Sequence, residues 1–354
     1  MRLLMSLISE RIVTATAREL MPAGPMPAPA DAAALVENLH DAAETAIDLV
    51  LDVMRLQPDV EDGARGRLAA GQTRVVDRLG WVGANARTFS RLLDDASPPG
   101  RGGIADRIRD RAARTGASVE LGGALALVGS RVLGQFDPFA GPAGTLYLVA
   151  PTVLEVETAI RARPRDFRLW VALHEQTHHV QFAAAPWLAD HLRERIGALL
   201  EPMLDASGLD GLQDTLRSLP AALRNRESLL DAVVAPSQRA LVDEVGALMS
   251  LLEGHADFVM DAVGPRVIPT VRSIRRSFDV RRHEAAGLRS LVSTLLGVDE
   301  KLAQYRRGAE FVRAVVAERG HGGLAPVWHG AENLPTAAEI AAPRLWLDRT
   351  GPTR

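Results

Sequence analysis

Apolar residues recur at intervals of three and four positions over most of the chain, which is the spacing of one face of an α-helix. The opening stretch, 1–20, reads as an amphipathic helix, and a long helix is expected to begin near Asp31, after the proline-containing stretch at 22–29. The same spacing predicts further helices over 60–95, 166–184, 186–204, 210–230, 237–262, 268–295 and 299–319.

Two short segments have the composition of strands instead. They are 124–136 and 144–150, which are rich in Val and Leu and are joined by a segment with Pro and Gly, so we expect a small antiparallel pair. The fold class is therefore predicted as mainly α with a small antiparallel β-sheet. The segment SPPGRGG at 97–103 is the predicted boundary between a helical N-terminal subdomain, 1–100, and a second domain, 101–354.

Composition narrows the class of protein. The chain has 354 residues, a formal net charge of −3 and no cysteine. The charge gives no basic surplus for neutralising phosphates, so no nucleic-acid partner is expected. The absence of cysteine excludes disulfides, thiolate zinc sites and cysteine nucleophiles, so any metal must be held by His, Asp or Glu.

No segment approaches the roughly 18 apolar residues that a membrane helix needs. Glu10 and Arg11 interrupt the apolar opening stretch too early for a signal peptide. We therefore expect a cytoplasmic protein without a membrane partner. The sequence leaves the oligomeric state open.

The segment most informative about chemistry is H-E-x-x-H at 174–178, inside a strongly helical pattern with Asp166 as the expected N-cap. Four residues make about one helical turn, so His174 and His178 project from one face and can both bind one Zn²⁺. Glu175 is the expected catalytic base, because it lies beside the metal and can accept a proton from water. His179 lies on a neighbouring face and is expected to pack or to support the site.

A catalytic zinc ion needs a third protein ligand. The metzincin pattern would place Gly at 181 and His at 184, but the chain has Gln181 and Ala184 there. Asp190, which would be the third ligand of an aspzincin-like site, follows Pro186 without the expected glycine-containing context and stays a weaker alternative.

A better third ligand lies in the segment LMSLLEGHADFVMDAVG, where Glu253 and Asp257 are four residues apart on one side of a predicted helix. The E-x-x-x-D spacing resembles the third-ligand helix of gluzincins. That resemblance implies that Glu253 binds zinc and that Asp257 hydrogen-bonds the first ligand, His174. His255 competes as a ligand, but it faces away from Glu253, so we expect it to line the site or to pack.

Other residues are candidates for roles around the metal. Tyr305 and His283 are candidates to stabilise the oxyanion of the transition state, although ordinary hydrogen-bonded side chains fit the pattern equally well. The strand at 144–150 fits either an edge that binds an extended substrate or a core strand. Five arginines fit either a substrate carboxylate site or a solvated helix face: Arg272, Arg275, Arg276, Arg281 and Arg282.

Several segments together resemble actinobacterial proteins described as zinc-dependent metalloproteases or hydrolases, one branch of which is associated with deazaflavin coenzyme biosynthesis. The segments are FRLWVALHEQTHHVQF, PWLADHL, EGHADFVMDAVG, LLGVDEKLAQY and LPTAAEIAAPRLWLDR. The resemblance implies a zincin-like catalytic domain over 101–354. The sequence has no Gly-rich phosphate loop, so the residues give no support to a direct role in coenzyme synthesis.

These observations lead to a first hypothesis, a zinc metallopeptidase of gluzincin type whose substrate is a peptide. The alternative is a non-catalytic helical scaffold with a structural zinc site, which should be closed by four protein ligands. A third hypothesis is a hydrolase of non-peptide amides. An accessible metal site with three protein ligands would favour hydrolysis over the scaffold.

Overall fold

The computed structural model describes residues 6–96, 104–201, 238–284 and 299–351, without the side chains of 104–111, 279–284 and 299–306. The N-terminal half contains α1 (Glu10–Leu20), α2 (Pro29–Met54), α3 (Pro58–Ala70), β1 (Gln72–Val76), α4 (Arg78–Ala96), α5 (Ile104–Gly129), β2 (Gly134–Asp137), β3 (Thr145–Val149), α6 (Ala150–Ala159) and α7 (Pro164–Ala184). The C-terminal half contains α10 (Arg239–Val267), α11 (Val271–Glu284), α13 (Asp299–Arg319), α14 (Ala325–His329), α15 (Ala337–Ala341) and α16 (Pro343–Thr350), with short 3₁₀ turns before and after α14.

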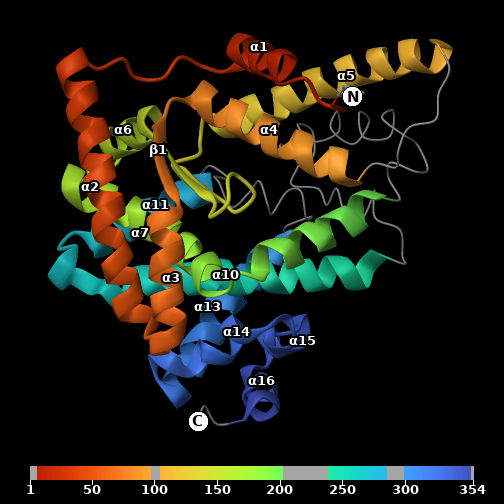
Figure 1. The fold of residues 1–354 in the computed structure, drawn as a ribbon. Helices are drawn as coiled ribbons and strands as arrows, with labels where there is room; N and C mark the ends of the chain where they lie inside the picture. The colour runs from red at the N-terminus through yellow and green to blue at the C-terminus, as the bar shows by residue number, and fades with distance from the viewer. Residues whose placement is uncertain (1–5, 97–103, 202–237, 285–298, 352–354) are drawn as a thin grey trace.

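The expectation of a mainly helical protein with a small sheet is confirmed (Figure 1). The predicted helices at 166–184 and 299–319 agree closely with α7 and α13. The segments predicted at 210–230 and 285–295 lie outside the described residues.

Two predictions of secondary structure were wrong. The stretch 60–95 is not one helical segment, because β1 separates α3 from α4. Three of the five residues of β1 are β-branched, which favours a strand, and α3 ends just before it, at Ala70, with Gly71 as its C-cap. In the stretch 124–136, residues 124–129 are the end of α5 and only 134–136, which belong to β2, form a strand. A short buried helix end and a buried strand give the same apolar run in a sequence.

The sheet has three strands in the order β1-β3-β2. β1 runs parallel to β3, and β2 runs antiparallel to it. β3 is therefore the central strand, and all five of its residues are buried. The possibility that 144–150 is the edge strand for a substrate is thus wrong, because β3 is paired on both sides. β2 occupies an edge of the sheet.

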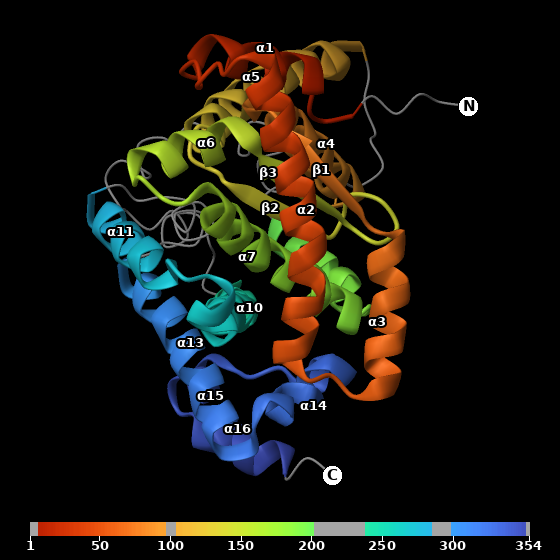
Figure 2. The same ribbon diagram turned by 90° about the vertical axis from the view of Figure 1, so that its left-hand side faces the viewer.

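Side chains alternate between the two faces of this sheet and meet different helices. Leu146 and Leu148 of β3 and Phe136 of β2 belong to the core that also contains α2, α7 and α10. Tyr147 and Val149 point to the other side, into a smaller core with α1, α4 and α5. Figures 1 and 2 show the sheet between these two groups of helices. α7, which carries H-E-x-x-H, lies on the side of the larger core.

α10 crosses α13 with the two backbones in direct contact. A Cβ atom added to Gly254 would lie 2.2 Å from the backbone of Gly308, and one added to Gly308 would lie 1.9 Å from the carbonyl oxygen of Ser250. Only glycine allows so close an approach. Because Gly254 directly follows Glu253, this crossing fixes the part of α10 that faces α7.

The first hundred residues contribute to both cores. β1 pairs with β3 along its whole length, and α2 packs along α7, where Gln176 donates a hydrogen bond to the carbonyl of Ala43. The division into subdomains at residue 100 stays a prediction. Within the described residues, no helix is both long enough and apolar enough to span a bilayer.

Candidate metal centre

α7 begins two residues earlier than predicted, and its N-cap is not the predicted residue. Its first residue is Pro164, whose missing N–H costs nothing at this position, and Arg163 is the N-cap. Asp166 is therefore not the N-cap. Its carboxylate accepts hydrogen bonds from the backbone N–H and the hydroxyl of Thr270, at 3.1 and 2.7 Å. Asp166 thus joins the start of α7 to the start of α11.

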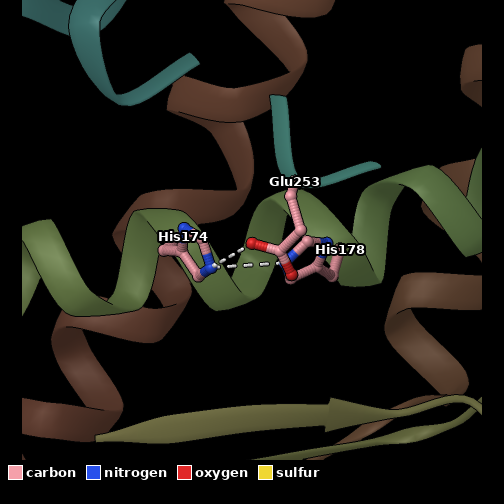
Figure 3. Close-up of side chains that lie close together, drawn as sticks. All are labelled: His174, His178 and Glu253. Carbon is pink, nitrogen blue, oxygen red and sulfur yellow. Dashed lines mark hydrogen bonds and ion pairs between the residues drawn. The ribbon is translucent and has the colours of Figure 1, made fainter. Parts of the chain in front are cut away.

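His174 and His178 meet Glu253 of α10 on the side of α7 that faces α10 (Figure 3). The two histidine Nε2 atoms are 3.3 Å apart. Glu253 Oε2 lies 3.6 Å from His174 Nε2, and Glu253 Oε1 lies 3.5 Å from His178 Nε2. The ligand atoms of a tetrahedral zinc site are about 3.3 Å apart when each lies 2.0–2.1 Å from the ion. The donor types and their separations therefore fit a zinc ion.

The three side chains are only partly buried. His174 is 22% exposed, His178 13% and Glu253 19%. Among the described residues they form the one group of three or more His, Asp or Glu side chains close enough to hold a metal ion. A zinc ion held by these three side chains would keep a coordination position open, which is typical of catalytic zinc sites and not of structural ones.

Glu175 is buried next to this group, between α7 and β2. A Cβ atom on Gly134 would lie 2.6 Å from Glu175 Cγ, so the absence of a side chain in β2 makes room for the glutamate. Burial, and then the negative charge of Glu253, raise the pKa of Glu175 to about 8, against a backbone hydrogen bond from Phe136 that lowers it. Coordination of Glu253 to a cation would remove the second of these causes.

Gln181 contacts His178 on the side of the ring opposite Glu253, a role that was not predicted from the sequence. Its Oε1 lies 3.0 Å from His178 Nδ1, and its Nε2 lies 3.0 Å from both the carbonyl oxygen of Leu252 and His255 Nδ1. The spacing in the sequence could have indicated this role. Residues three apart on a helix are neighbours, and a histidine that binds a metal usually has a hydrogen-bond partner for its other ring nitrogen.

His255 lies away from the three converging side chains, as its place two residues after Glu253 implies. It is buried, contacts the ring of Trp328 at 5.5 Å and bonds to Gln181. Burial, and then the nearby His178 and His321, lower the pKa of His255 to about 3. His255 is therefore a neutral packing residue that reaches the site only through Gln181.

His179 is also outside the group. Its ring stacks on Phe136 of β2 at 4.7 Å, and its Nδ1 lies 3.0 Å from Gln176 Oε1. Burial lowers the pKa of His179 to about 4. Its position agrees with the packing role expected from the sequence, because its ring joins α7 to the edge strand.

The remaining candidates divide into three cases. Asp257 lies one turn after Glu253 and is partly buried, and its pairing with His174 stays a prediction. Asp190 is exposed and pairs with Arg193, so it is not a third ligand. The side chains of Tyr305 and His283 lie outside the description, as do those of Arg281 and Arg282.

The arginines at the start of α11 are better explained as a solvated helix face. Arg272 and Arg276 are exposed, and Arg275 forms an ion pair with Asp261 and donates to the backbone carbonyl of Asp257. Arg275 thus ties α11 to α10 near the site.

A separate cavity of about 780 Å³ lies on the other face of the sheet, against α1 and α4. Its lining includes Arg74 of β1, Tyr147 of β3 and Arg91 of α4, but none of the three converging residues. This cavity is therefore distinct from the candidate metal centre.

The fold and the three converging side chains together define a mainly helical protein with a candidate metal centre between α7 and α10. The chain belongs to the zincin-like metallopeptidase family, whose sequence model matches residues 8–347. It is also similar to a solved structure from Chloroflexus aurantiacus described as a "putative hydrolase with a novel fold", with 29% identity, a TM-score of 0.67 and coverage of 97% of this chain and 98% of that one. No curated protein gives a match.

Proposed function

We propose that this chain is a zinc-dependent peptidase of gluzincin type. The observation that carries the proposal is that His174 and His178 of α7 and Glu253 of α10 meet with their ligand atoms 3.3–3.6 Å apart. Membership of a metallopeptidase family supports a metal-dependent hydrolase in general. The glutamate as third ligand is what distinguishes a gluzincin from the other zincin types.

The residues of the site have separate roles in this proposal. His174, His178 and Glu253 hold the ion. When bound, zinc is a Lewis acid that makes water more acidic and polarises a carbonyl group. Glu175 takes the proton from the attacking water and later delivers it to the leaving nitrogen as the peptide bond breaks. The packing of Glu175 against Gly134 holds its carboxylate close to the ligands.

β2 is the strand along which an extended peptide would bind. Val149 N–H donates to the carbonyl of Leu133, which makes this a hydrogen-bonded pair of the antiparallel ladder. Pairs alternate along such a ladder, so the backbone groups of Gly134 and Phe136 point away from β3, toward the outer edge, where the N–H of Phe136 already donates to Glu175. A substrate added to this edge would lie beside Glu175.

The scaffold alternative has less support. A structural site should be closed by a fourth protein ligand, and His255 and His179 are the nearest histidines that could supply it. Both are buried elsewhere, with His255 on Gln181 and His179 on Gln176. Tyr305 and His283 remain the predicted donors to the oxyanion.

The proposal is tested by measuring zinc content with mass spectrometry on purified full-length protein. We expect one zinc ion per chain in the wild type, loss of zinc in His178→Ala and Glu253→Ala, and retention in His255→Ala. Circular dichroism checks that each variant is folded. A wild type without zinc, or loss of zinc in His255→Ala with retention in Glu253→Ala, would overturn this ligand set.

A further inference from the structure

Gln181 is completely buried between α7 and α10, and each polar atom of its amide has a partner. Oε1 faces His178 Nδ1 at 3.0 Å. Nε2 faces the carbonyl oxygen of Leu252 and the Nδ1 of His255, both at 3.0 Å. One side chain thus connects a candidate zinc ligand on α7 with Leu252 and His255 of α10, which lie one residue before and two residues after Glu253.

The carbonyl oxygen of Leu252 determines which way this amide is oriented. A carbonyl oxygen only accepts hydrogen bonds, so the group 3.0 Å away must be the NH₂ of Gln181 and not its oxygen. The Oε1 atom is then left facing His178 Nδ1. Because Oε1 also only accepts, Nδ1 of His178 must carry the proton.

A neutral imidazole carries one proton, so a proton on Nδ1 leaves a lone pair on Nε2. Nε2 is the atom of His178 that lies 3.5 Å from Glu253 and 3.3 Å from His174 Nε2. The amide therefore selects the one neutral form of His178 that can bind a metal at the place where the three side chains meet.

We propose that Gln181 is a positioning residue that holds His178 in its Nδ1–H form and fixes His178 relative to Glu253 through Leu252. The inference rests on the proposed function, since it takes His178 and Glu253 as zinc ligands. It adds a residue whose effect on zinc binding passes entirely through hydrogen bonds. Partners of this kind orient ligand histidines and raise their affinity for the metal.

The chain contains a matched control on the same helix. Gln176 is also buried, its Oε1 lies 3.0 Å from Nδ1 of a histidine three residues later, and its Nε2 donates to a backbone carbonyl of another helix, that of Ala43. That histidine is His179, which is not one of the converging residues. Gln176→Met and Gln181→Met remove equivalent hydrogen bonds, but only the second touches a proposed ligand.

The first measurement compares metal-free wild-type protein with metal-free Gln181→Met. Long-range ¹H–¹⁵N NMR spectra of ¹⁵N-histidine-labelled protein show which ring nitrogen carries the proton, and His178→Ala identifies the signals of His178. We expect His178 in its Nδ1–H form in the wild type and a mixture of both forms in Gln181→Met. An Nε2–H form in the wild type would overturn the inference.

The second measurement is zinc affinity by competition with a chromophoric chelator. We expect Gln181→Met to bind zinc about 10–100-fold more weakly than the wild type and Gln176→Met to bind it equally well. Equal affinity in Gln181→Met and the wild type would contradict the inference while leaving the proposed function intact. A wild type that binds no zinc would instead contradict the proposed function, and the NMR measurement would still decide the form of His178.

Discussion

Two carboxylates are buried on opposite faces of β2, and their surroundings differ. Glu175 reaches the strand from α7 and packs on Gly134, whereas Asp137 belongs to the strand itself and points toward α4. Glu175 is 4% exposed and Asp137 2% exposed. Burial raises the pKa of both groups, since an acid removed from water holds its proton more tightly.

The neighbours of the two acids decide what each can do. The carboxylate of Asp137 accepts hydrogen bonds from the Thr88 hydroxyl and from the backbone N–H of Phe139, and the charge of Arg91 also lowers its pKa against the effect of burial. Glu175 has one backbone hydrogen bond and faces the negative charge of Glu253. Both carboxylate oxygens of Asp137 thus have hydrogen-bond partners, and this side chain anchors a loop. Glu175 has fewer partners, so its carboxyl group can exchange a proton.

The largest expected effect is on catalysis. Glu175→Gln keeps the shape of the side chain but removes the proton acceptor, so the rate of peptide hydrolysis should fall by about 10²–10⁴-fold with zinc content unchanged. Asp137→Asn should leave the rate near that of the wild type. Steady-state hydrolysis of a peptide library, with zinc content measured on the same samples, checks both. Full activity in a folded, zinc-loaded Glu175→Gln would refute the assigned base.

A smaller loss of activity is expected from a change in β2 that leaves Glu175 itself unaltered. Gly134→Ala places a Cβ atom where Glu175 Cγ now packs, so the carboxylate must move. We expect a rate loss of about 10–100-fold and a loss of about 1–3 kcal/mol in the free energy of unfolding. Peptide hydrolysis and urea unfolding measure the two changes.

Gly246→Ala is the control for this experiment. Gly246 is buried on α10, the helix that carries Glu253, but a Cβ atom there would have no neighbour within 4 Å. Its hydrolysis rate should stay close to that of the wild type. If both glycine variants lose activity equally, the contact between Gly134 and Glu175 does not explain the loss.

The local parts of the site could be predicted from the sequence. His174 and His178 are one turn apart, so any helix over these residues brings them to one face. The position of Glu253 is harder to predict, because it lies 75 positions after His178 in the sequence. Its distance to the histidines depends on how α10 crosses α13 at Gly254 and Gly308. The E-x-x-x-D resemblance pointed to it without showing that crossing.

The non-local parts were missed for a physical reason. Gly134 is required because Glu175, from a distant segment, occupies the space of its side chain, and no pattern within β2 indicates that. β1 is a strand because β3 pairs with it. Its five residues are too few to stand out in a sequence where helical patterns precede and follow them. The spacing of Gln181 from His178 is local, but its contacts with Leu252 and His255 depend on how α10 packs on α7.

The smallest expected effect concerns stability and pH. The folded-state pKa of Asp137 is raised above its ordinary value of 3.8, so the native protein binds this proton more tightly than the unfolded chain does. The resulting stability is fully present below pH 3.8 and is lost as the pH rises through the folded-state pKa. Asp137→Asn cannot ionise, and its amide can still bond to Thr88 and Phe139. Urea unfolding from pH 3 to pH 7 gives the free energy of unfolding of Asp137→Asn and of the wild type. The value for Asp137→Asn minus the value for the wild type should increase as the pH rises. A difference that stays constant or decreases would show that the surroundings of Asp137 fully offset its burial.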